Sequence, residues 1–474
     1  MTGIYLAGAL ILSGLIFFNR NRLINALLIV GFLTMQWGYT IYVITHKNMT
    51  DLNYFRHDAI AILLLATLGI ISIPALLHSY EYIYKEKDNA RSRSIYYASM
   101  ILLIAAISTA YTSSHIAVTW IFIEITTLCA SALIFHRRNS GSLEATWKYI
   151  FICSISLIFV FVGILFLSIS YGKTSEGDLS YAALLAKAPE MNTKWLKPAF
   201  VFIFTGFTAK FGLVPMYTAG IDAKDKAPAP AAALFSSVLM NVGFIGIFRV
   251  YEIVAQSQLR EWAGHLLMIA SLLSLFISTV YMLKVKNIKR MLAYSSIEHV
   301  GIITLGLAAG GIGYYAAVLH TILHAFVKSA MFFQTGQVYS IYKSKSIYYV
   351  GNYFKYNLPG ALVFLAAFIC ITAMPPSGLF ISEFLIFRSL FEGHQILVMI
   401  VLAILLTTII WAFGKNVFKL LYTLPVNFDE SKIEKVNHGE TMMQFILVSL
   451  VFYLGVFQPA GFVNLINEAI KNLM

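Results

Sequence analysis

Long apolar segments, most of them about 18 to 25 residues, recur from one end of the chain to the other with short polar stretches between them. The runs are continuous and do not alternate with polar residues, which is typical of membrane helices and not of a transmembrane barrel. The pattern predicts an all-α polytopic membrane protein with about fourteen transmembrane helices. These lie at residues 3–18, 23–46, 58–80, 94–112, 114–136, 147–171, 195–219, 228–254, 262–285, 291–309, 312–340, 357–390, 395–423 and 441–466.

The order of these helices suggests an internal symmetry. We expect an N-terminal three-helix segment at 1–93, two groups of five helices at 94–254 and 262–423, and an inner loop with a C-terminal helix at 424–474. Because five is an odd number, the second group enters the membrane from the opposite side. The two groups are therefore predicted to be inverted repeats, each a half-channel.

Two of the predicted helices carry glycine and proline interruptions. One has Gly206, Gly212 and Pro215 around Lys210, and the other, MPPSGLFISEF, has two prolines and a glycine just before Glu383. Interrupted helices at corresponding places in two halves are typical of an ion site in a transporter. Simple proline kinks are the alternative for either segment taken separately.

The composition excludes several classes of protein. Hydrophobic residues make up 59% of the chain and charged residues 12%, so no large soluble domain is expected. The three cysteines, Cys129, Cys153 and Cys370, lie in apolar segments without metal-ligand spacing. No nucleophile–base pair or nucleotide motif is present, so we expect no catalytic centre and no cofactor in this chain.

The basic residues orient the chain. If the N-terminus lies outside, most of the 34 lysines and arginines fall in inner loops, Lys224 among them. The chain is thus predicted to cross a cell inner membrane many times with its N-terminus outside. Loops next to anionic lipid account for the net charge of +12 without nucleic acid.

Two lysines stand in the middle of apolar runs. They are Lys210 in KPAFVFIFTGFTAKFGLVP and Lys328 in VLHTILHAFVKSAMFF. A charge at the centre of a bilayer costs at least about 2.5–3.5 kcal/mol, so it persists mainly where it faces a partner, a cavity or an ion path. Glu124, which has no basic residue within a helical turn, needs a partner, and Lys210 is the natural one. The pair is either a switchable proton site or a static ion pair.

A histidine series points to proton transfer. His320, His324 and Lys328 are spaced i, i+4, i+8, which places them on one helix face over about 12 Å. His299, in MLAYSSIEHVGII, is a further relay candidate, and Glu298 beside it is expected near the inner membrane edge. Imidazoles relay protons near neutral pH. Packed histidines and metal ligation stay open as alternatives, but no acidic or cysteine ligand accompanies the HxxxH pair, so no metal site is predicted.

Glu383 and Asn241 are two further positions on the predicted proton route. Glu383 is predicted to exchange protons with water at the outer end of the relay, although a local salt bridge with Arg388 is an alternative. Asn241 is a possible bridging polar residue, but it cannot carry a proton at accessible pH.

Three ordered motifs, KRMLAYSSIEHVGII, HTILHAFVKSAMFF and MPPSGLFISEF, carry a family resemblance. Together they resemble the antiporter-like subunits of respiratory complex I, of Mrp-type cation/proton antiporters and of membrane-bound [NiFe] hydrogenases. The SSIEH form and the glutamate of the last motif are most similar to the F component of formate hydrogenlyase-type hydrogenases.

The resemblance implies fourteen helices with two inverted five-helix repeats. It also implies a Glu124–Lys210 ion pair, a central relay of His320, His324 and Lys328, and Glu383 as the exit residue. Redox chemistry is then expected in a peripheral arm, and other membrane subunits are expected as partners. Asn241 stands where many relatives carry a bridging lysine.

These observations favour a proton-translocating subunit of a redox-driven membrane complex of the hydrogenase or NADH dehydrogenase type. One alternative is a subunit of a cation/proton antiporter, with Na⁺ as a possible ion, or of an ion-coupled uptake complex. The other, motivated by Asn241, is a non-conducting scaffold for a peripheral enzyme.

Overall fold

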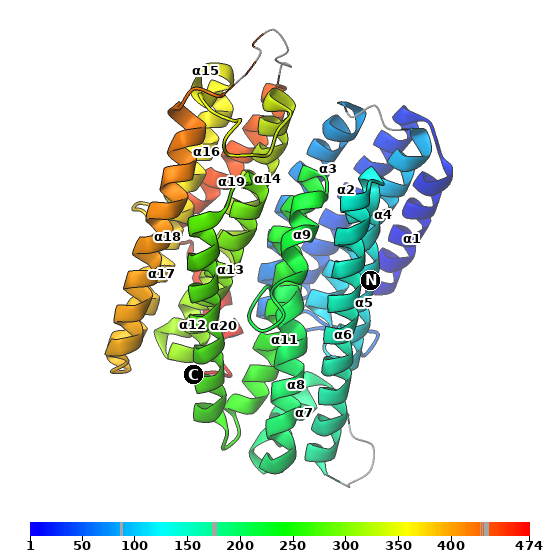
Figure 1. Cartoon of the computed structure of the whole chain (residues 1–474). Helices are drawn as coiled ribbons and strands as arrows, with labels where there is room; N and C mark the ends of the chain where they lie inside the picture. The colour runs from blue at the N-terminus through cyan, green and yellow to red at the C-terminus, as the bar shows by residue number, and fades with distance from the viewer. Residues whose placement is uncertain (86–88, 173–177, 427, 429, 431–435) are drawn as a thin grey trace. The chain divides into compact units, whose positions relative to one another are not determined.

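A computed structural model covers the whole chain and describes all residues except 86–88, 173–177, 427, 429 and 431–435. Its described part is almost entirely helical (Figure 1). The helices are α1 (Thr2–Phe18), α2 (Arg22–Thr45), α3 (Ala59–Lys85), α4 (Ala90–Thr112), α5 (Ile116–Ile134), α6 (Ser140–Tyr171), α7 (Tyr181–Lys187), α8 (Thr193–Phe211), α9 (Ala219–Lys226), α10 (Ala229–Ser236), α11 (Val238–Ala255), α12 (Arg260–Lys284), α13 (Ile288–Ala309), α14 (Ile312–Tyr342), α15 (Tyr353–Tyr356), α16 (Leu358–Ile371), α17 (Gly378–Glu392), α18 (Ile396–Tyr422), α19 (His438–Val456) and α20 (Ala460–Ala469).

The predicted membrane architecture is confirmed. Within the described residues, 11 helices are long and apolar enough to cross a membrane, and α1 and α16 are shorter apolar helices. Two short strands, β1 (Thr50–Asp51) and β2 (Phe55–Arg56), pair antiparallel in the link between α2 and α3.

The chain forms two compact units. The first contains Met1–Ala227, Val238–Leu266 and Asn464–Met474, and the second contains Pro228–Ser237 and Leu267–Val463. The boundaries of the three-helix segment and of the two five-helix repeats stay a prediction.

Both predicted interruptions are present. Helix α8 ends at Phe211, and Gly212 follows with φ 86°, a left-handed conformation that glycine adopts without steric cost. Helix α16 ends at Ile371, and α17 begins only at Gly378. Each break leaves the carbonyl end of a half-helix inside the chain's apolar region, where those carbonyls need partners.

A third interruption was not predicted. The sequence predicts one helix over 228–254, but α10 stops at Ser236 and α11 starts at Val238. Ser237 lies between them with φ −123° and ψ −97°, and its hydroxyl donates to the carbonyl oxygen of Ala233 at 2.7 Å. No glycine or proline marks this position, so the sequence carries no conventional signal for the break.

Glycines allow the helices around α8 to approach closely. A Cβ at Gly206 of α8 would lie 2.4 Å from the carbonyl oxygen of Ser156 in α6, and a Cβ at Gly243 of α11 would lie 2.3 Å from the backbone nitrogen of Phe211. Small residues at such crossings let membrane helices pack backbone to backbone. Helix α8 is therefore held on two sides near its broken end.

Helix α14 is the centre of the second unit. Its middle is fully buried, and it packs against α10, α13, α16, α17 and α19. The break between α16 and α17 is itself covered by α19, where a Cβ at Gly455 would lie 2.4 Å from the carbonyl oxygen of Pro376. The histidines of α14 consequently face protein on all sides.

The Gly206 contact predicts a selective loss of stability. We expect Gly206→Ala to lower the stability of the protein by about 1–3 kcal/mol, because the added methyl group overpacks the α6–α8 crossing. Gly31→Ala is the matched control, since no atom of the described residues lies within 4 Å of a Cβ there. Thermal unfolding in detergent measures both, and equal midpoints for the two variants would contradict this packing account.

Candidate functional site

Lys210 lies in the last turn of α8 and is 5% exposed. Its Nζ donates to the phenol oxygen of Tyr149 in α6 at 3.1 Å, and it lies 5.1 Å from the centre of the Tyr149 ring. The free carbonyls at the end of a helix favour a positive charge. The broken helix therefore supplies Lys210 with a polar environment that an unbroken apolar helix lacks.

Glu124 lies on α5 and is half-buried. Its carboxylate accepts a hydrogen bond from the hydroxyl of Thr127 at 3.2 Å. The charge of Glu124 acts on Lys210, but no ion pair within 4.0 Å joins the two side chains in the part of the chain that the structure describes. The functional pairing of these residues stays a prediction.

Lys224 is a residue whose importance the sequence did not reveal. It was expected in an inner loop, but the structure buries it on α9, directly after the first break. Its Nζ lies 3.1 Å from the sulfur of Met240, and burial lowers the pKa of Lys224 to about 7. A lysine with this pKa gains and loses a proton near neutral pH.

Asn241 is buried on α11 in the first unit. Its amide nitrogen Nδ2 has no hydrogen-bond partner among the described residues. A buried amide donor usually has a partner, so this position favours an internal water.

The second unit brings three predicted histidines together. Nδ1 of His299 on α13 lies 3.0 Å from Nε2 of His320 on α14. The rings of His299 and His324 have their centres 5.2 Å apart. All three side chains are buried. The sequence spacing placed His320 and His324 on one face, but only the fold shows that His299 lies against both.

Ser382 on α17 extends this cluster and was not predicted. Its hydroxyl lies 2.9 Å from Nδ1 of His320 and also 2.9 Å from the carbonyl oxygen of Leu379. If the hydroxyl donates to Leu379, it accepts from His320, and Nε2 of His320 then accepts from His299. If the hydroxyl turns to His320, the order of donors reverses. The chain Ser382–His320–His299 can therefore hold its protons in two directions, as a proton wire must.

The end of half-helix α16 lies at this cluster. Ile371 is the last residue of α16, and its backbone interacts with the ring of His299. The carbonyl end of a helix carries partial negative charge and so favours a cation. The break therefore offsets part of the cost of burying a positive charge at His299.

Lys328 and Glu298 lie near the same cluster. Lys328 is 0% exposed, and its Nζ donates to the carbonyl oxygen of Leu292 at 3.1 Å. Glu298 was expected at the membrane edge in contact with water, but it is buried and interacts electrostatically with Lys328. Glu298 is buried because the residues of α13 around it are buried on every face of the helix.

Glu383 lies in the second turn of α17, next to Ser382. The proposed local salt bridge with Arg388 is wrong, because Nε of Arg388 donates to the carboxylate of Glu392 at 2.7 Å in an exposed pair. The carboxylate of Glu383 instead points to the histidines. One oxygen of Glu383 and one nitrogen each of His299 and His320 all lie within 4.8 Å of one another.

A buried amide network continues from α14. The amide of Gln334 lies 3.0 Å from the side-chain oxygen of Gln337 and also contacts Gln444 of α19. Tyr353 donates to Gln334 at 2.8 Å. Single glutamines in apolar segments gave no sequence signal, but together they form a polar path toward the end of α14 that follows Lys328.

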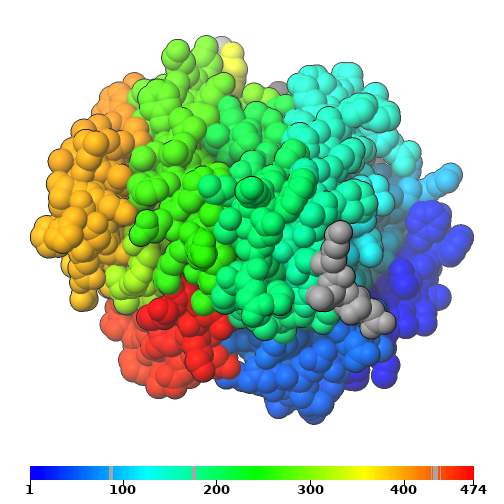
Figure 2. Space-filling model, turned by 90° about the horizontal axis from the view of Figure 1, so that it is seen from below, coloured from blue at the N-terminus to red at the C-terminus, as the bar shows by residue number. Residues whose placement is uncertain are grey.

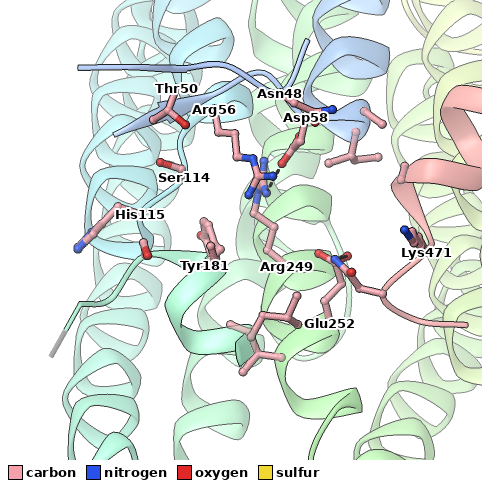
Figure 3. A pocket seen from close by; sticks show the side chains of 18 of the residues that line it. Asn48, Thr50, Arg56, Asp58, Ser114, His115, Tyr181, Arg249, Glu252 and Lys471 are labelled. Atoms are coloured by element: carbon pink, nitrogen blue, oxygen red, sulfur yellow. Dashed lines mark hydrogen bonds and ion pairs between the residues drawn. The ribbon is translucent and has the colours of Figure 1, made fainter. Parts of the chain in front are cut away.

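The first unit also contains a separate polar pocket of about 520 Å³ (Figure 3). In its wall, the guanidinium of Arg249 donates to Asp58 at 2.7 Å and lies 5.0 Å from the centre of the Tyr181 ring. Glu252, one turn further along α11, accepts from Asn472 at 3.2 Å. None of the predicted relay residues is among the described residues that line it.

The C-terminal segment closes one side of this pocket. Lys47 pairs with Glu468, and Figure 2 shows the red C-terminal residues beside the blue segment that follows α2. His115 caps α5 through its Nδ1 on another side, and burial lowers its pKa against the opposing charge of Asp178. His115 is therefore a neutral acceptor, and its capping bond requires this.

Comparisons with known proteins agree with this architecture. Residues 113–410 match the profile of the family described as "NADH:quinone oxidoreductase/Mrp antiporter, TM". The chain is 28% identical to "Hydrogenase-4 component F homolog" of Methylacidiphilum infernorum (isolate V4), covering 95% of this chain and 94% of that protein. It is 27% identical to "Hydrogenase-4 component B" of Escherichia coli (strain K12) over 72% of this chain and 51% of that protein.

A solved structure has the same fold. A chain of the membrane-bound sulfane sulfur reductase, an archaeal respiratory membrane complex, superimposes with a TM-score of 0.87 at 20% identity, covering 100% of this chain and 97% of that one. At this identity the similarity concerns the fold alone.

The hydrogen bond from Ser382 predicts a functional effect. We expect Ser382→Ala to slow proton transfer by about tenfold, because it removes the group that orients His320. Ser389→Ala is the control on the same helix, since the hydroxyl of Ser389 donates to the carbonyl oxygen of Gly310. Proton uptake into proteoliposomes by the purified complex measures both variants. Equal rates for the two serine variants would refute a role for Ser382.

Proposed function

The chain belongs to the NADH:quinone oxidoreductase/Mrp antiporter transmembrane family, and from that premise we propose that it is a proton-translocating, antiporter-like subunit of a redox-driven membrane complex. The complex is of the hydrogenase or NADH dehydrogenase type, as are the complexes named for its relatives. This chain moves protons, and the electron chemistry takes place in partner subunits.

The observation that carries the proposal is the arrangement of Ser382, His320 and His299 with Glu383 beside them. Hydrogen bonds of 2.9 and 3.0 Å connect groups that accept and donate protons, inside a membrane unit from which bulk water is excluded. Histidines that only stabilise the fold do not need a hydrogen-bonded chain whose donors can point in either direction.

Each unit has its own part in the proposed transfer. In the first unit, Lys210 and Lys224 take up protons on either side of the first break, and Glu124 changes the proton affinity of Lys210 through its charge. In the second unit, Lys328 passes a proton to the histidines, and Glu383 exchanges it with water. Asn241 is the bridging polar residue of this route.

The family and the distribution of charge support a proposal for the partners and the location. We propose further membrane subunits, a peripheral redox arm and surrounding lipid as neighbours of this chain in a cell inner membrane. The N-terminus faces outward, because most basic residues then lie on the inner side.

One observation favours a second candidate function. The unpaired amide of Asn241 interrupts the run of titratable groups in the first unit, as expected for a scaffold that no longer conducts. Dependence of transport on sodium would distinguish a Na⁺/H⁺ exchanger from both the proton-translocating subunit and the non-conducting scaffold.

Purification on a tag in mild detergent, with mass spectrometry of the bound proteins, tests the assignment. Redox subunits with metal centres are expected to co-purify. Recovery with small antiporter subunits alone, or with no redox protein, would refute the redox-driven assignment.

Lys328 is the residue whose loss is predicted to reduce proton uptake. We expect Lys328→Ala to leave the complex assembled but to reduce redox-driven proton uptake about tenfold, because the buried cation next to Glu298 is lost. Lys415→Ala, which removes an exposed lysine of α18, is the control. A pH-sensitive dye inside proteoliposomes reports the rate. Unchanged uptake in Lys328→Ala would favour the scaffold.

A further inference from the structure

The histidine cluster has the donor set of a transition-metal site. His299, His320 and Glu383 come from three different helices, α13, α14 and α17, and one ligand atom of each lies within 4.8 Å of the others. Two imidazole nitrogens and one carboxylate oxygen form a common ligand set for zinc, with a fourth position for water. The sequence alone predicts no metal site, because no acidic ligand accompanies His320 and His324 along the chain. In the fold, Glu383 on another helix provides the acidic ligand, and His299 takes the place of His324 in the ligand set.

The spacing of the atoms suits an ion. The two histidine nitrogens are 3.0 Å apart, about 0.3 Å less than the separation of two ligands that each lie about 2.0–2.1 Å from one tetrahedral zinc, so a small movement of the rings admits the ion. The carboxylate of Glu383 must move inward from its present position to complete the set. It is available to do so, because no hydrogen bond or ion pair holds Glu383 within the described parts of the chain.

A second layer of contacts orients the ligands. Nδ1 of His320 is held by the hydroxyl of Ser382 at 2.9 Å, which leaves Nε2 of His320 directed at the cluster. Metal-binding histidines characteristically have such a partner on the nitrogen that faces away from the metal. The backbone of Ile371, at the carbonyl end of α16, interacts with the His299 ring and favours a positive charge there.

Charged groups of both signs surround the cluster. Lys328 acts on His299 and opposes a cation, whereas Glu298 acts on both Lys328 and Glu383. One lysine therefore faces two carboxylates around the cluster. A divalent ion at the cluster favours the ionised form of the carboxylate that binds it.

We propose that His299, His320 and Glu383 bind a divalent transition-metal ion of the zinc type, and that the bound ion shuts the proton wire. The metal takes the same nitrogen lone pairs that carry the shared proton, so proton and metal exclude each other. The binding site stands on the geometry alone, while the block of transport rests on the proposed function.

Co²⁺ is the probe for the site, because it absorbs visible light strongly in a tetrahedral site. We expect the purified full-length protein in its complex to take up one Co²⁺ with visible bands that Zn²⁺ displaces. His320→Ala and the isosteric Glu383→Gln are expected to lose the bands, whereas His265→Ala, which removes an exposed histidine of α12, keeps them. Absence of the bands in the native protein, or their persistence in both ligand variants, would overturn the site.

Inhibition of proton uptake by Zn²⁺ is the second test of the proposal. Zn²⁺ is expected to inhibit proton uptake by the native complex at least about tenfold, with full recovery on adding a chelator. Normal uptake that zinc does not affect would overturn the block while leaving the proposed function intact. A complex that binds Co²⁺ at these ligands but takes up no protons retains the metal site and loses the proposed function instead.

Discussion

A positive charge inside an apolar unit needs a polar partner, and in this protein the ends of broken helices provide it. Lys210 lies in the last turn of α8, and His299 lies beside the last residue of α16. In both places a helix stops inside the membrane region and leaves carbonyl groups without intrahelical donors. The breaks are therefore the structural condition on which the titratable groups of each unit depend.

The same breaks require close packing around them, because a half-helix cannot hold its own position. Gly206 and Gly243 let α6 and α11 contact α8 directly, and Gly455 lets α19 cover the link between α16 and α17. Rigid surroundings keep hydrogen bonds such as Lys210–Tyr149 and His320–Ser382 in place. A lysine held by a phenol instead of a contacting carboxylate retains the ability to lose its proton, which a tight ion pair would oppose.

The sequence predicted the helices and the two main breaks well, because apolar length and proline or glycine interruptions are local signals. It also identified Lys210, Lys328 and the histidines, since buried charge is conspicuous in an apolar run. It missed Ser382 and Lys224, and it placed Glu298 in water, because burial depends on which helix lies opposite. The Ser237 break has no local signal, and the association of Glu383 with His299 joins residues far apart in the chain.

The most direct test of the central claim is the number of protons taken up per electron transferred by the complex purified on this chain and reconstituted in vesicles. The account predicts uptake that follows redox turnover, collapses with an uncoupler and is independent of sodium. It also predicts that the ratio falls when His320 is replaced by alanine, while electron transfer continues. An unchanged proton-to-electron ratio in that variant would contradict the account, because the protons would then travel by a route outside this cluster.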